Sequence, residues 1–498
     1  MEIHNKLAGT DIKKVWMITA NKYMLKSLKI ISRNVSDSTY YSTANKEIFL
    51  EAFGGAKSVG KSAFLLEING VNVLLDCGIA FSQPYYSGKL NQIYNKLNYV
   101  YCSHAHLDHS GLIPMILKNI YRKVILTPPT FDFSYRLWKD YLRLRVPYNH
   151  PYEVEDVNFN ELFYKKTFKL LYNGNPFKLK EQNYLDGNVT ATLYNAGHIL
   201  GSSMILIDNG DKKILYTGDF NYRDTCFLKK AEFPDEINIL ITECTNGNRS
   251  VKDQDLLKEE LKDEIKETLN NQGTVIVPVY AVGRSPEILS IISEDPEIIK
   301  YPIYIGGMIN SMNSVIQRFL NETGDWKFSD EIKKNDFIFS PDNLFRDLRS
   351  EDDDVIYDEN KPKLIVTTSG VMQKGTYSYS LFDRFKHSSK HKIIFNGYLF
   401  KNSPGEVLIN NRVNLFDDYF GVGPTRINIQ KRWIDFSGHA SREDHIKLLK
   451  SLNGLEKVIP VHGDNSNYSE YIKFAREIGK ERGFEVVQIN DGERVKLS

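Results

Sequence analysis

A histidine-rich array constrains this chain more than any other feature. Four potential metal ligands directly follow the short apolar run Tyr99-Val100-Tyr101; they are His104, His106, Asp108 and His109. A turn there can direct the first two to one cation and the last two to a second. Imidazole and carboxylate are suitable zinc ligands, and catalytic zinc sites keep one position open for water. Without a cation, groups crowded in this way would gain little from each other, so the array predicts a metal site.

Three further candidate ligands each lie in a turn after an apolar run. They are His198, Asp219 and His462. Each could be an ordinary turn or capping residue on its own, but together with the array they complete two sites. Asp219 is suited to bridge two metals, because one carboxylate has two oxygens. Two metals roughly 3.5–4 Å apart can clamp both oxygens of an in-line phosphoryl displacement and create hydroxide at neutral pH.

Asp76 and the cysteines lie near these motifs. Asp76 ends the apolar run Leu74-Leu75 and could cap the following turn, but we favour a role in holding a ligand histidine through its free ring N–H. The four cysteines form no CxxC pair, and three of them adjoin polar motif residues. Because cysteine is commonly buried, we expect them to be reduced and buried at strand ends instead of metal ligands.

Length and periodicity predict two structural units in the 498 residues. Residues 46–247 contain short strands, including a hairpin around Asn69-Gly70, with helices between them, which favours a layered αββα sandwich. Residues 248–432 alternate strands and helices, which indicates a separate parallel α/β unit. Histidine-bearing segments resume near Trp433, so this unit is predicted to be inserted, and residues 433–498 return to the first domain. Residues 1–45 are an extension of unknown role.

The order of these motifs resembles a known family. Asp76, the array at 104–109, His198 and Asp219 look like the four motifs of the metallo-β-lactamase superfamily. Glu243, His439 in Ser437-Gly438-His439-Ala440-Ser441, and His462 resemble three motifs specific to its β-CASP nucleases. That group includes ribonuclease J and the pre-mRNA 3′-end-processing endonuclease. The resemblance runs from about Phe53 to Asp464.

The resemblance implies an α/β fold in which a metallo-β-lactamase αββα sandwich carries an inserted parallel α/β β-CASP domain. It implies a metal-dependent phosphodiester hydrolase with two zinc ions. Glu243 and His439 would form a general-acid pair that protonates the leaving oxygen. The candidate catalytic residues are Asp76, Asp108, Glu243 and His439. His462 favours RNA as substrate, since DNA-specific members lack a histidine there.

Two loops resemble parts of the family's lid that face the cleft. One loop contains Arg284 and the other contains Ser369-Gly370. The guanidinium of Arg284 and backbone N–H groups of these loops could hold phosphates of single-stranded RNA. Ser437, Gly438 and Ala440 flank His439 and are further candidates. The Ser-Gly-His-Ala-Ser form resembles ribonuclease J, whereas Asn396-Gly397-Tyr398 resembles the endonuclease branch. Endonucleolytic and 5′-3′ exonucleolytic cutting therefore both stay open.

The sequence also departs from the family pattern. Lys57 or Ser58 stands where an acidic residue is usual, and Asn246 replaces a tyrosine after the Glu243 motif. A histidine expected near Arg249 is absent. These departures bear on substrate positioning and leave the metal ligands intact.

Several other signals point away from further functions. Gly55 to Ser62 matches a P-loop, but that mechanism needs a helix starting at Lys61-Ser62, and Ser62 opens a strand; no nucleotide cofactor is expected. The apolar run at 15–18 is too short and polar for a membrane span or signal peptide, so a cytoplasmic protein is expected. The segment from Lys386 to Lys392, with His387 and His391, and the acidic run 351–354 are expected to be solvated loops.

Other functions compete with the ribonuclease. With a net charge of +1, any basic nucleic-acid surface must be local. Arg136 and Lys139 lie on a segment that could either follow an RNA backbone or form the solvated face of an amphipathic helix. The alternatives are a single-stranded DNA nuclease, a small-molecule metallohydrolase, and a non-catalytic RNA-binding subunit of a processing complex. A non-catalytic subunit should have broken ligand sets, whereas this chain has an intact one. A homodimer is an expectation from the family alone.

Overall fold

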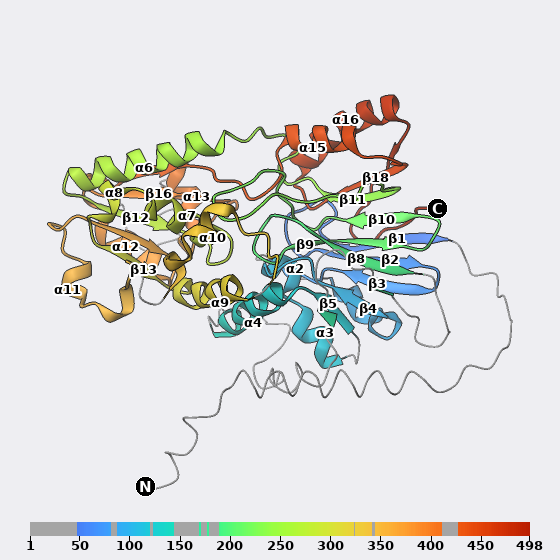
Figure 1. Cartoon of the computed structure of the whole chain (residues 1–498), viewed down its shortest axis with the longest axis horizontal. Helices are drawn as coiled ribbons and strands as arrows, with labels where there is room; N and C mark the ends of the chain where they lie inside the picture. Colours follow the sequence, from blue (N-terminus) through green and yellow to red (C-terminus); the bar gives the residue numbers. More distant parts are fainter. Residues whose placement is uncertain are drawn as a thin grey trace, which may run out of the picture. The chain divides into compact units, whose positions relative to one another are not determined.

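The computed structural model describes residues 47–80, 87–119, 123–143, 169–170, 177–178, 189–322, 324–340, 344–410 and 427–498. The predicted N-terminal extension, residues 1–45, lies outside the described residues. The strands of the described part form three sheets (Figure 1). In these residues no helix is long and apolar enough to cross a membrane.

The first sheet has the strand order β20-β1-β2-β3-β4-β5-β6. Its strands are β1 (Ile48–Gly54), β2 (Ala63–Ile68), β3 (Val71–Leu75), β4 (Tyr99–Tyr101), β5 (Lys123–Leu126), β6 (Lys169–Leu170) and β20 (Arg494–Lys496). Asn69 and Gly70 have φ angles of 48° and 77°, the positive values that a type I′ turn requires. They join β2 to β3 as an antiparallel hairpin, which confirms the turn prediction. Because β3 and β4 are parallel, the residues that follow them, including Asp76 and His104, meet at one edge.

The second sheet has the order β19-β18-β11-β10-β9-β8-β7. Its strands are β7 (Phe177–Lys178), β8 (Thr190–Asn195), β9 (Ser203–Asp208), β10 (Lys213–Tyr216), β11 (Ile239–Glu243), β18 (Lys457–Val461) and β19 (Glu485–Val486). Strands β10, β11 and β18 are parallel neighbours. Their carboxyl ends therefore lie together, which brings Asp219, Glu243 and His462 to the same edge.

The two sheets pack face to face between two layers of helices. Alternate residues, such as Leu66 of the first sheet and Ile241 of the second, form the core between the sheets. On the outer face of the first sheet, Trp138 belongs to a second apolar cluster, and Tyr471 belongs to the cluster outside the second sheet. The covering helices are α3 (Ile113–Asn119), α4 (Pro128–Arg143), α15 (Arg442–Ser451) and α16 (Asn465–Arg482). Figure 1 shows α15 and α16 on one side of the sheets and α3 and α4 on the other. This is the predicted αββα sandwich.

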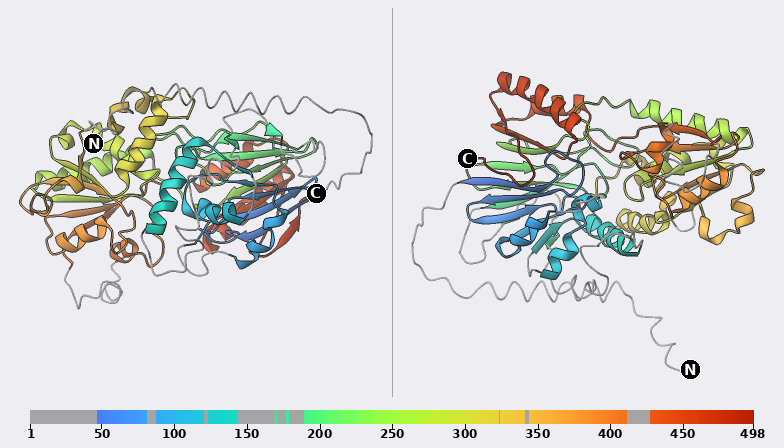
Figure 2. Two further views of the ribbon diagram at one scale, coloured as in Figure 1. Left: turned by 90° about the horizontal axis from the view of Figure 1, so that it is seen from below. Right: turned by 180° about the vertical axis from the view of Figure 1, so that it is seen from behind.

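The third sheet has the order β14-β13-β15-β12-β16-β17, and all of its pairings are parallel. Its strands are β12 (Thr274–Pro278), β13 (Ile303–Gly306), β14 (Arg346–Asp347), β15 (Lys363–Thr367), β16 (Lys392–Phe395) and β17 (Gln430–Trp433). Along β12, Val275 and Val277 face one apolar cluster and Ile276 faces another. Helices α6 (Gln254–Asn270), α7 (Arg284–Ser293) and α9 (Ile309–Asn321) cover the first face, and α12 (Tyr377–Phe385) and α13 (Pro404–Ile409) cover the second (Figure 2). A parallel sheet buried on both faces is the predicted α/β unit.

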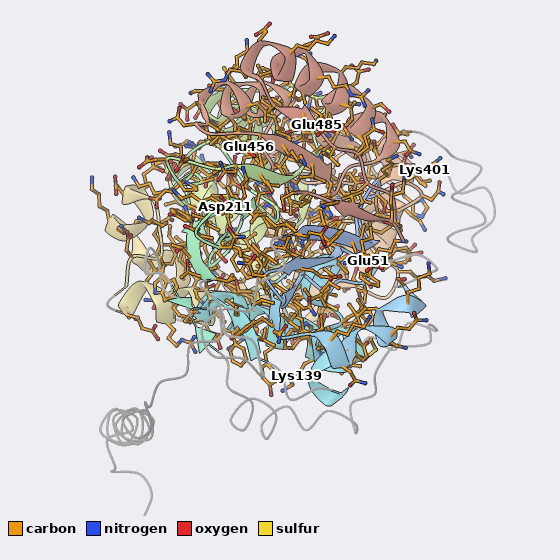
Figure 3. All side chains as sticks on the ribbon, turned by 90° about the vertical axis from the view of Figure 1, so that its right-hand side faces the viewer. Glu51, Lys139, Asp211, Lys401, Glu456 and Glu485 are labelled. Carbon is orange, nitrogen blue, oxygen red and sulfur yellow. The ribbon has the colours of Figure 1, made fainter. Side chains whose placement is uncertain are left out.

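Short elements and charged turns complete the described part. The remaining elements are η1 (Gly88–Gln92), η2 (Tyr94–Lys96), α2 (Leu107–Ser110), α8 (Pro296–Ile299), α10 (Asp330–Lys334), η3 (Asp336–Phe339), η4 (Leu348–Ser350) and α11 (Asp353–Ile356). The β9–β10 turn carries Asp211, which Figure 3 labels together with Glu456. Lys212 Nζ lies 2.6 Å from Glu456 Oε1, an exposed ion pair of the kind that adds little stability.

Two predictions about loops are corrected by the structure. His391 is fully buried, and its Nδ1 accepts a hydrogen bond from Thr274 N at 3.0 Å. Lys392 and Lys386 are also buried, and Lys392 pairs with Glu264, so the expected solvated loop holds for the exposed His387 and Ser389 but not for the ends of the segment. The reason is that β16 begins at Lys392 and is flanked by β12 and β17. The acidic run 351–354 is exposed as predicted, but its last two residues begin the one-turn helix α11.

The domain boundaries remain a proposal. Strands β12 to β17 lie between β11 and β18 in the chain, which is the order an insertion requires. We propose that residues 248–432 form the inserted domain and that 46–247 and 433–498 form the sandwich. Strand β17 ends at Trp433, one residue beyond the proposed boundary.

Candidate active site

The seven predicted ligands gather at the adjoining edges of the first two sheets. One group consists of His104, His106, His198 and Asp219, and another consists of Asp108, His109 and His462. In each group the potential ligand atoms lie within 4.8 Å of one another. They come from the turn after β4, the short helix α2, and the turns after β8, β10 and β18. Residues that are far apart in sequence thus form two clusters of metal-binding groups.

The hydrogen bonds around the first group fix which ring nitrogens carry protons. Ser103 Oγ donates to Asp76 Oδ2 at 2.8 Å, so it accepts from His104 Nδ1 at 3.0 Å. His198 Nδ1 donates to the Gly438 carbonyl at 2.8 Å, and His106 Nε2 faces the Val282 carbonyl at 3.4 Å. Since a carbonyl can only accept, each histidine directs its unprotonated nitrogen toward the other two.

These three nitrogens lie close together without a hydrogen between them. His106 Nδ1 lies 3.1 Å from His104 Nε2 and 3.2 Å from His198 Nε2. Burial lowers the pKa of His104 and of His198, which keeps both rings in the neutral form that binds metals. Three facing lone pairs repel each other, whereas nitrogen ligands about 2.0–2.1 Å from a tetrahedral zinc lie about 3.4 Å apart. The geometry therefore fits a bound cation.

The second group contains polar atoms that lack partners among the described residues. His109 Nδ1 donates to Asp76 Oδ2 at 2.7 Å, which leaves its buried Nε2 without a hydrogen bond. That atom lies 3.4 Å from Asp219 Oδ2, and His462 Nε2 lies 3.6 Å from Asp219 Oδ1. Burial raises the pKa of Asp219, but His109, His462 and His439 hold it well below its usual range. Asp219 thus presents an ionised carboxylate to both groups.

Asp76 supports the ligands from behind. It is fully buried and accepts hydrogen bonds from His109 Nδ1, from Ser103 N and Oγ, and from the Tyr216 hydroxyl at 2.7 Å. We propose that Asp76 orients His109, as the sequence predicts. Ser62 Oγ lies 2.8 Å from His462 Nδ1, so it contacts the His462 ring in the way that Asp76 contacts the His109 ring. Ser62, Ser103 and Tyr216 are supporting residues that sequence reasoning did not assign, because Ser62 stood out only as part of a P-loop match and the other two are common residue types beside strand ends.

The predicted acid pair lies beside the ligands. His439 Nδ1 is 3.0 Å from both carboxylate oxygens of Glu243, and its ring centroid lies 4.8 Å from that of His198. Glu243 ends β11 and also accepts hydrogen bonds from Phe220 N and Thr245 N. Burial lowers the pKa of His439, but Glu243 and Asp219 raise it to about 9. The imidazole is therefore protonated near neutral pH.

The candidate substrate-binding residues already have contacts within the protein, and these contacts differ from one residue to the next. Arg284 begins α7, pairs with Glu287, and lies so close to Gly438 that a side chain there would approach its Nη2 to 3.3 Å. Ser369 Oγ accepts from Gln373 N, and Gly370 packs against Tyr280 N. Ser437 Oγ accepts from Asn246 Nδ2. Ala440 is fully buried and donates its N–H to Phe220 O, so it supports the loop from within.

Three aromatic residues lie at the carboxyl ends of strands in the third sheet. The Tyr280 hydroxyl donates to the Tyr398 carbonyl at 2.9 Å, and Trp433 Nε1 donates to the Gly397 carbonyl at 3.0 Å. The exposed fractions of Tyr398 and Trp433 are 46% and 41%. Burial and the charges of Asp464 and Asp108 raise the pKa of Tyr398. The sequence did not single out Trp433, because only the fold brings β17 beside β16.

The remaining motif predictions have structural outcomes. All four cysteines are buried and free, which confirms the predicted burial, and burial raises their pKa values well above the usual range. Cys77, Cys102 and Cys244 lie just after strands as expected, whereas Cys226 lies in the loop after β10. The loop of the P-loop match contains no helix, and its Gly55 carbonyl accepts the N–H of His462. On α4, Arg136 Nε donates to Ser311 Oγ of α9, whereas Lys139 is exposed.

Comparison with known proteins agrees with this site. The family model "Anti-Pycsar protein Apyc1" matches residues 51–269, and "Zn-dependent metallo-hydrolase RNA specificity domain" matches residues 424–487. The chain is 30% identical to RNase aCSPSF2 of Saccharolobus solfataricus, over 92% of this chain and 87% of the relative. It is 31% identical to an RNase J-like protein of Methanocaldococcus jannaschii, over 87% of this chain and 96% of the relative.

Two more distant comparisons extend this result. Identity to the transcription termination factor FttA of Lokiarchaeum is 30%, over 85% of this chain and 68% of the relative. A solved structure of a protein of unknown function from Enterococcus faecalis V583 shares the fold, with a TM-score of 0.55 and 14% identity over 91% of this chain and all of that chain.

The fold and the clustered histidine and aspartate side chains define a hydrolase of the metallo-β-lactamase class. Within that class, the chain belongs to the β-CASP family of nucleases.

Proposed function

We propose that this protein is a two-zinc ribonuclease that hydrolyses phosphodiester bonds of single-stranded RNA, as an endonuclease, a 5′-3′ exonuclease or both. The observation that carries the proposal is the set of facing, unprotonated imidazole nitrogens beside the His439–Glu243 pair. Further support comes from relatives named as RNases and from the RNA specificity domain matched at residues 424–487.

In this proposal each cation has its own ligand group. His104, His106 and His198 would hold one, Asp108, His109 and His462 would hold the other, and Asp219 would serve both. When bound, two divalent cations would supply charge that stabilises the phosphate oxygens and activates the attacking water. The protein contributes rigid placement, because Asp76, Ser103 and Gly438 set the orientation and tautomer of three of the ligand rings.

His439 is suited to protonate the leaving oxygen. An alkoxide is a poor leaving group, so a proton supplied during bond cleavage lowers the barrier, typically by a factor of about 10²–10⁴. The Nδ1–H of His439 is held by Glu243, so its Nε2 is the nitrogen available to transfer a proton. Arg284, which adjoins Gly438, would contact the phosphate backbone.

The aromatic residues favour a single-stranded nucleic acid over a small molecule as the substrate. Tyr398 follows β16 and Trp433 ends the neighbouring strand β17, and the two residues are 46% and 41% exposed. Stacking on aromatic rings binds unpaired bases with little regard to their identity, at about 1–3 kcal/mol per base. A small-molecule hydrolase has no need for such rings outside its metal site.

The test is a cleavage assay with RNA labelled separately at each end, alongside the matching DNA. The purified protein is used after chelation and again after zinc is restored. We expect zinc-dependent cutting of RNA that is lost in His439→Ala and kept in His387→Ala, a histidine exposed on the lid. The two labels distinguish internal cuts from removal of nucleotides at the 5′ end. If the zinc-loaded protein cuts neither polymer, the nuclease proposal is wrong.

A further inference from the structure

The turn after β11 holds two functional loops at once. Glu243 binds the ring of His439, and Thr245 Oγ1 donates to the carbonyl of His462 at 2.9 Å. Asn246 Nδ2 donates to Ser437 Oγ at 2.8 Å and lies 3.4 Å from the His439 carbonyl. Asn246 is 3% exposed, so its amide has few alternatives to these partners. One turn thus contacts both the candidate acid and a candidate metal ligand.

The loop that carries His439 depends on this contact for its shape. Residues 436–440 contain no regular helix or strand, and His439 N donates to Ser437 Oγ at 3.2 Å. At the far end of the loop, Ala440 N donates to Phe220 O. Glu243 orients the imidazole ring, whereas Asn246 holds the backbone on which the ring is mounted. Both are needed to place one nitrogen, because a ring can be aimed correctly only from a fixed backbone.

We propose that Asn246 is a positioning residue for protonation of the leaving group, a role that rests on the proposed function of His439. An asparagine suits this place because its amide has two N–H donors, one for a hydroxyl and one for a carbonyl. An aspartate of the same shape has none. Residues 246 and 439 are separated by 193 positions, so only the fold brings them together.

A displaced acid has a specific kinetic signature. The alkoxide released from RNA needs a proton, whereas 4-nitrophenolate is stable enough to leave without one. Loss of positioning should therefore slow RNA cleavage and leave hydrolysis of bis(4-nitrophenyl) phosphate nearly intact. Damage to the metal site or to the fold would slow both reactions together.

The experiment compares Asn246→Asp and Asn246→Ala with the wild type on both substrates. The matched control is Asn248→Ala, because Asn248 is exposed and donates to Ser466 Oγ instead of the His439 loop. We expect kcat on RNA to fall about 10- to 100-fold in both Asn246 variants with KM unchanged, within the range set by general acid catalysis. The rate on the nitrophenyl ester should change less than about 3-fold. Equal losses on both substrates, or no loss on RNA, would overturn the proposal.

A second measurement does not depend on activity. In protein labelled with ¹⁵N-histidine, the Nδ1–H of His439 should give a slowly exchanging signal, assigned by its loss in His439→Gln. We expect this signal to shift or broaden in Asn246→Ala and to persist in Asn248→Ala. If the wild type cuts no RNA, the proposed function fails, while an undisturbed His439 signal in Asn246→Ala is what refutes the role of Asn246.

Discussion

His439 Nδ1 lies 3.0 Å from both carboxylate oxygens of Glu243, and we expect this contact to set the pH range of activity. Burial lowers the pKa of His439, but Glu243 and Asp219 raise it to about 9. Because the role proposed for His439 is that of an acid, activity should fall as pH rises through that pKa. In Glu243→Gln the pKa falls, so the alkaline limb of kcat/KM should move to lower pH.

This prediction is checked with an RNA oligonucleotide between pH 6 and 10. At pH 8 the Glu243→Gln variant should lose about 10²-fold or more, the scale of general acid catalysis. Glu236→Gln serves as the matched control, since Glu236 lies on the surface and pairs with Lys213. An alkaline limb that stays in place in Glu243→Gln would show that His439 is not the group that titrates.

Removal of the metal should destabilise the protein, because the lone pairs of the facing nitrogens of His104, His106 and His198 then repel each other without a cation between them. A ligand at 100 times its Kd stabilises a fold by about 2.7 kcal/mol. We therefore expect chelation to lower Tm and zinc to restore it. Asp219→Asn should retain less zinc by mass spectrometry than the wild type, whereas Asp211→Asn, in an exposed turn, should bind the full amount. Equal zinc contents would refute the shared role of Asp219.

His445 should make the fold sensitive to acid. It lies on α15 between the rings of Phe220 and Tyr471, and neither of its ring nitrogens has a hydrogen-bond partner among the described residues. Burial lowers its pKa to about 4. The unfolded chain binds a proton near pH 6.5 and the folded protein does not, so stability is full above that pH and falls as pH drops toward 4.

The size of this effect is up to about 3 kcal/mol for a shift of this kind. His445→Phe removes the titrating group and keeps an aromatic ring in place. The free energy of unfolding, measured with urea at pH 7.5 and pH 4.5, should fall less in the variant than in the wild type. An identical fall in both proteins would assign the acid sensitivity to other groups.

Trp433 should contribute to RNA binding more than to chemistry. A stacking contact is worth about 1–3 kcal/mol per base, so Trp433→Ala should raise KM for RNA roughly 10-fold with little change in kcat. Hydrolysis of bis(4-nitrophenyl) phosphate should change less than RNA cleavage, because that substrate has no neighbouring nucleotides to stack on the ring. Tyr377→Ala, at a side chain of similar exposure on α12, is the aromatic control. A KM that is unchanged in Trp433→Ala would remove this ring from the binding surface.

The clustering of the ligand candidates could be predicted in part from sequence, because several of them follow apolar strands. In the second sheet the carboxyl ends of parallel strands meet at one edge, so Asp219 and His462 could be placed together before the fold was known. The Asn69-Gly70 hairpin was predictable for a local reason, since few residues accept the two positive φ angles of that turn.

Contacts that depend on strand order could not be predicted. The loop before β16 is polar, yet His391 is buried because β16 is flanked by β12 and β17. Trp433 meets Gly397 only because β17 is the parallel neighbour of β16. Asn246 looked like a departure from a family motif, and its contact with the His439 loop emerges only in three dimensions.

The contact between His106 Nε2 and the Val282 carbonyl joins a metal ligand to the loop after β12. The same apolar cluster contains Ala105, between the two histidines, and Val282 itself. If the inserted domain acts as a lid over the proposed metal site, we expect its closure and cation binding to be linked, because both would act on the orientation of the His106 ring. By thermodynamic reciprocity, the factor by which cation binding favours lid closure equals the factor by which closure raises the affinity for the cation. Entry of an RNA strand that opens the lid would therefore lower the affinity for the cation. The full affinity would return only when the lid closes over the bound RNA.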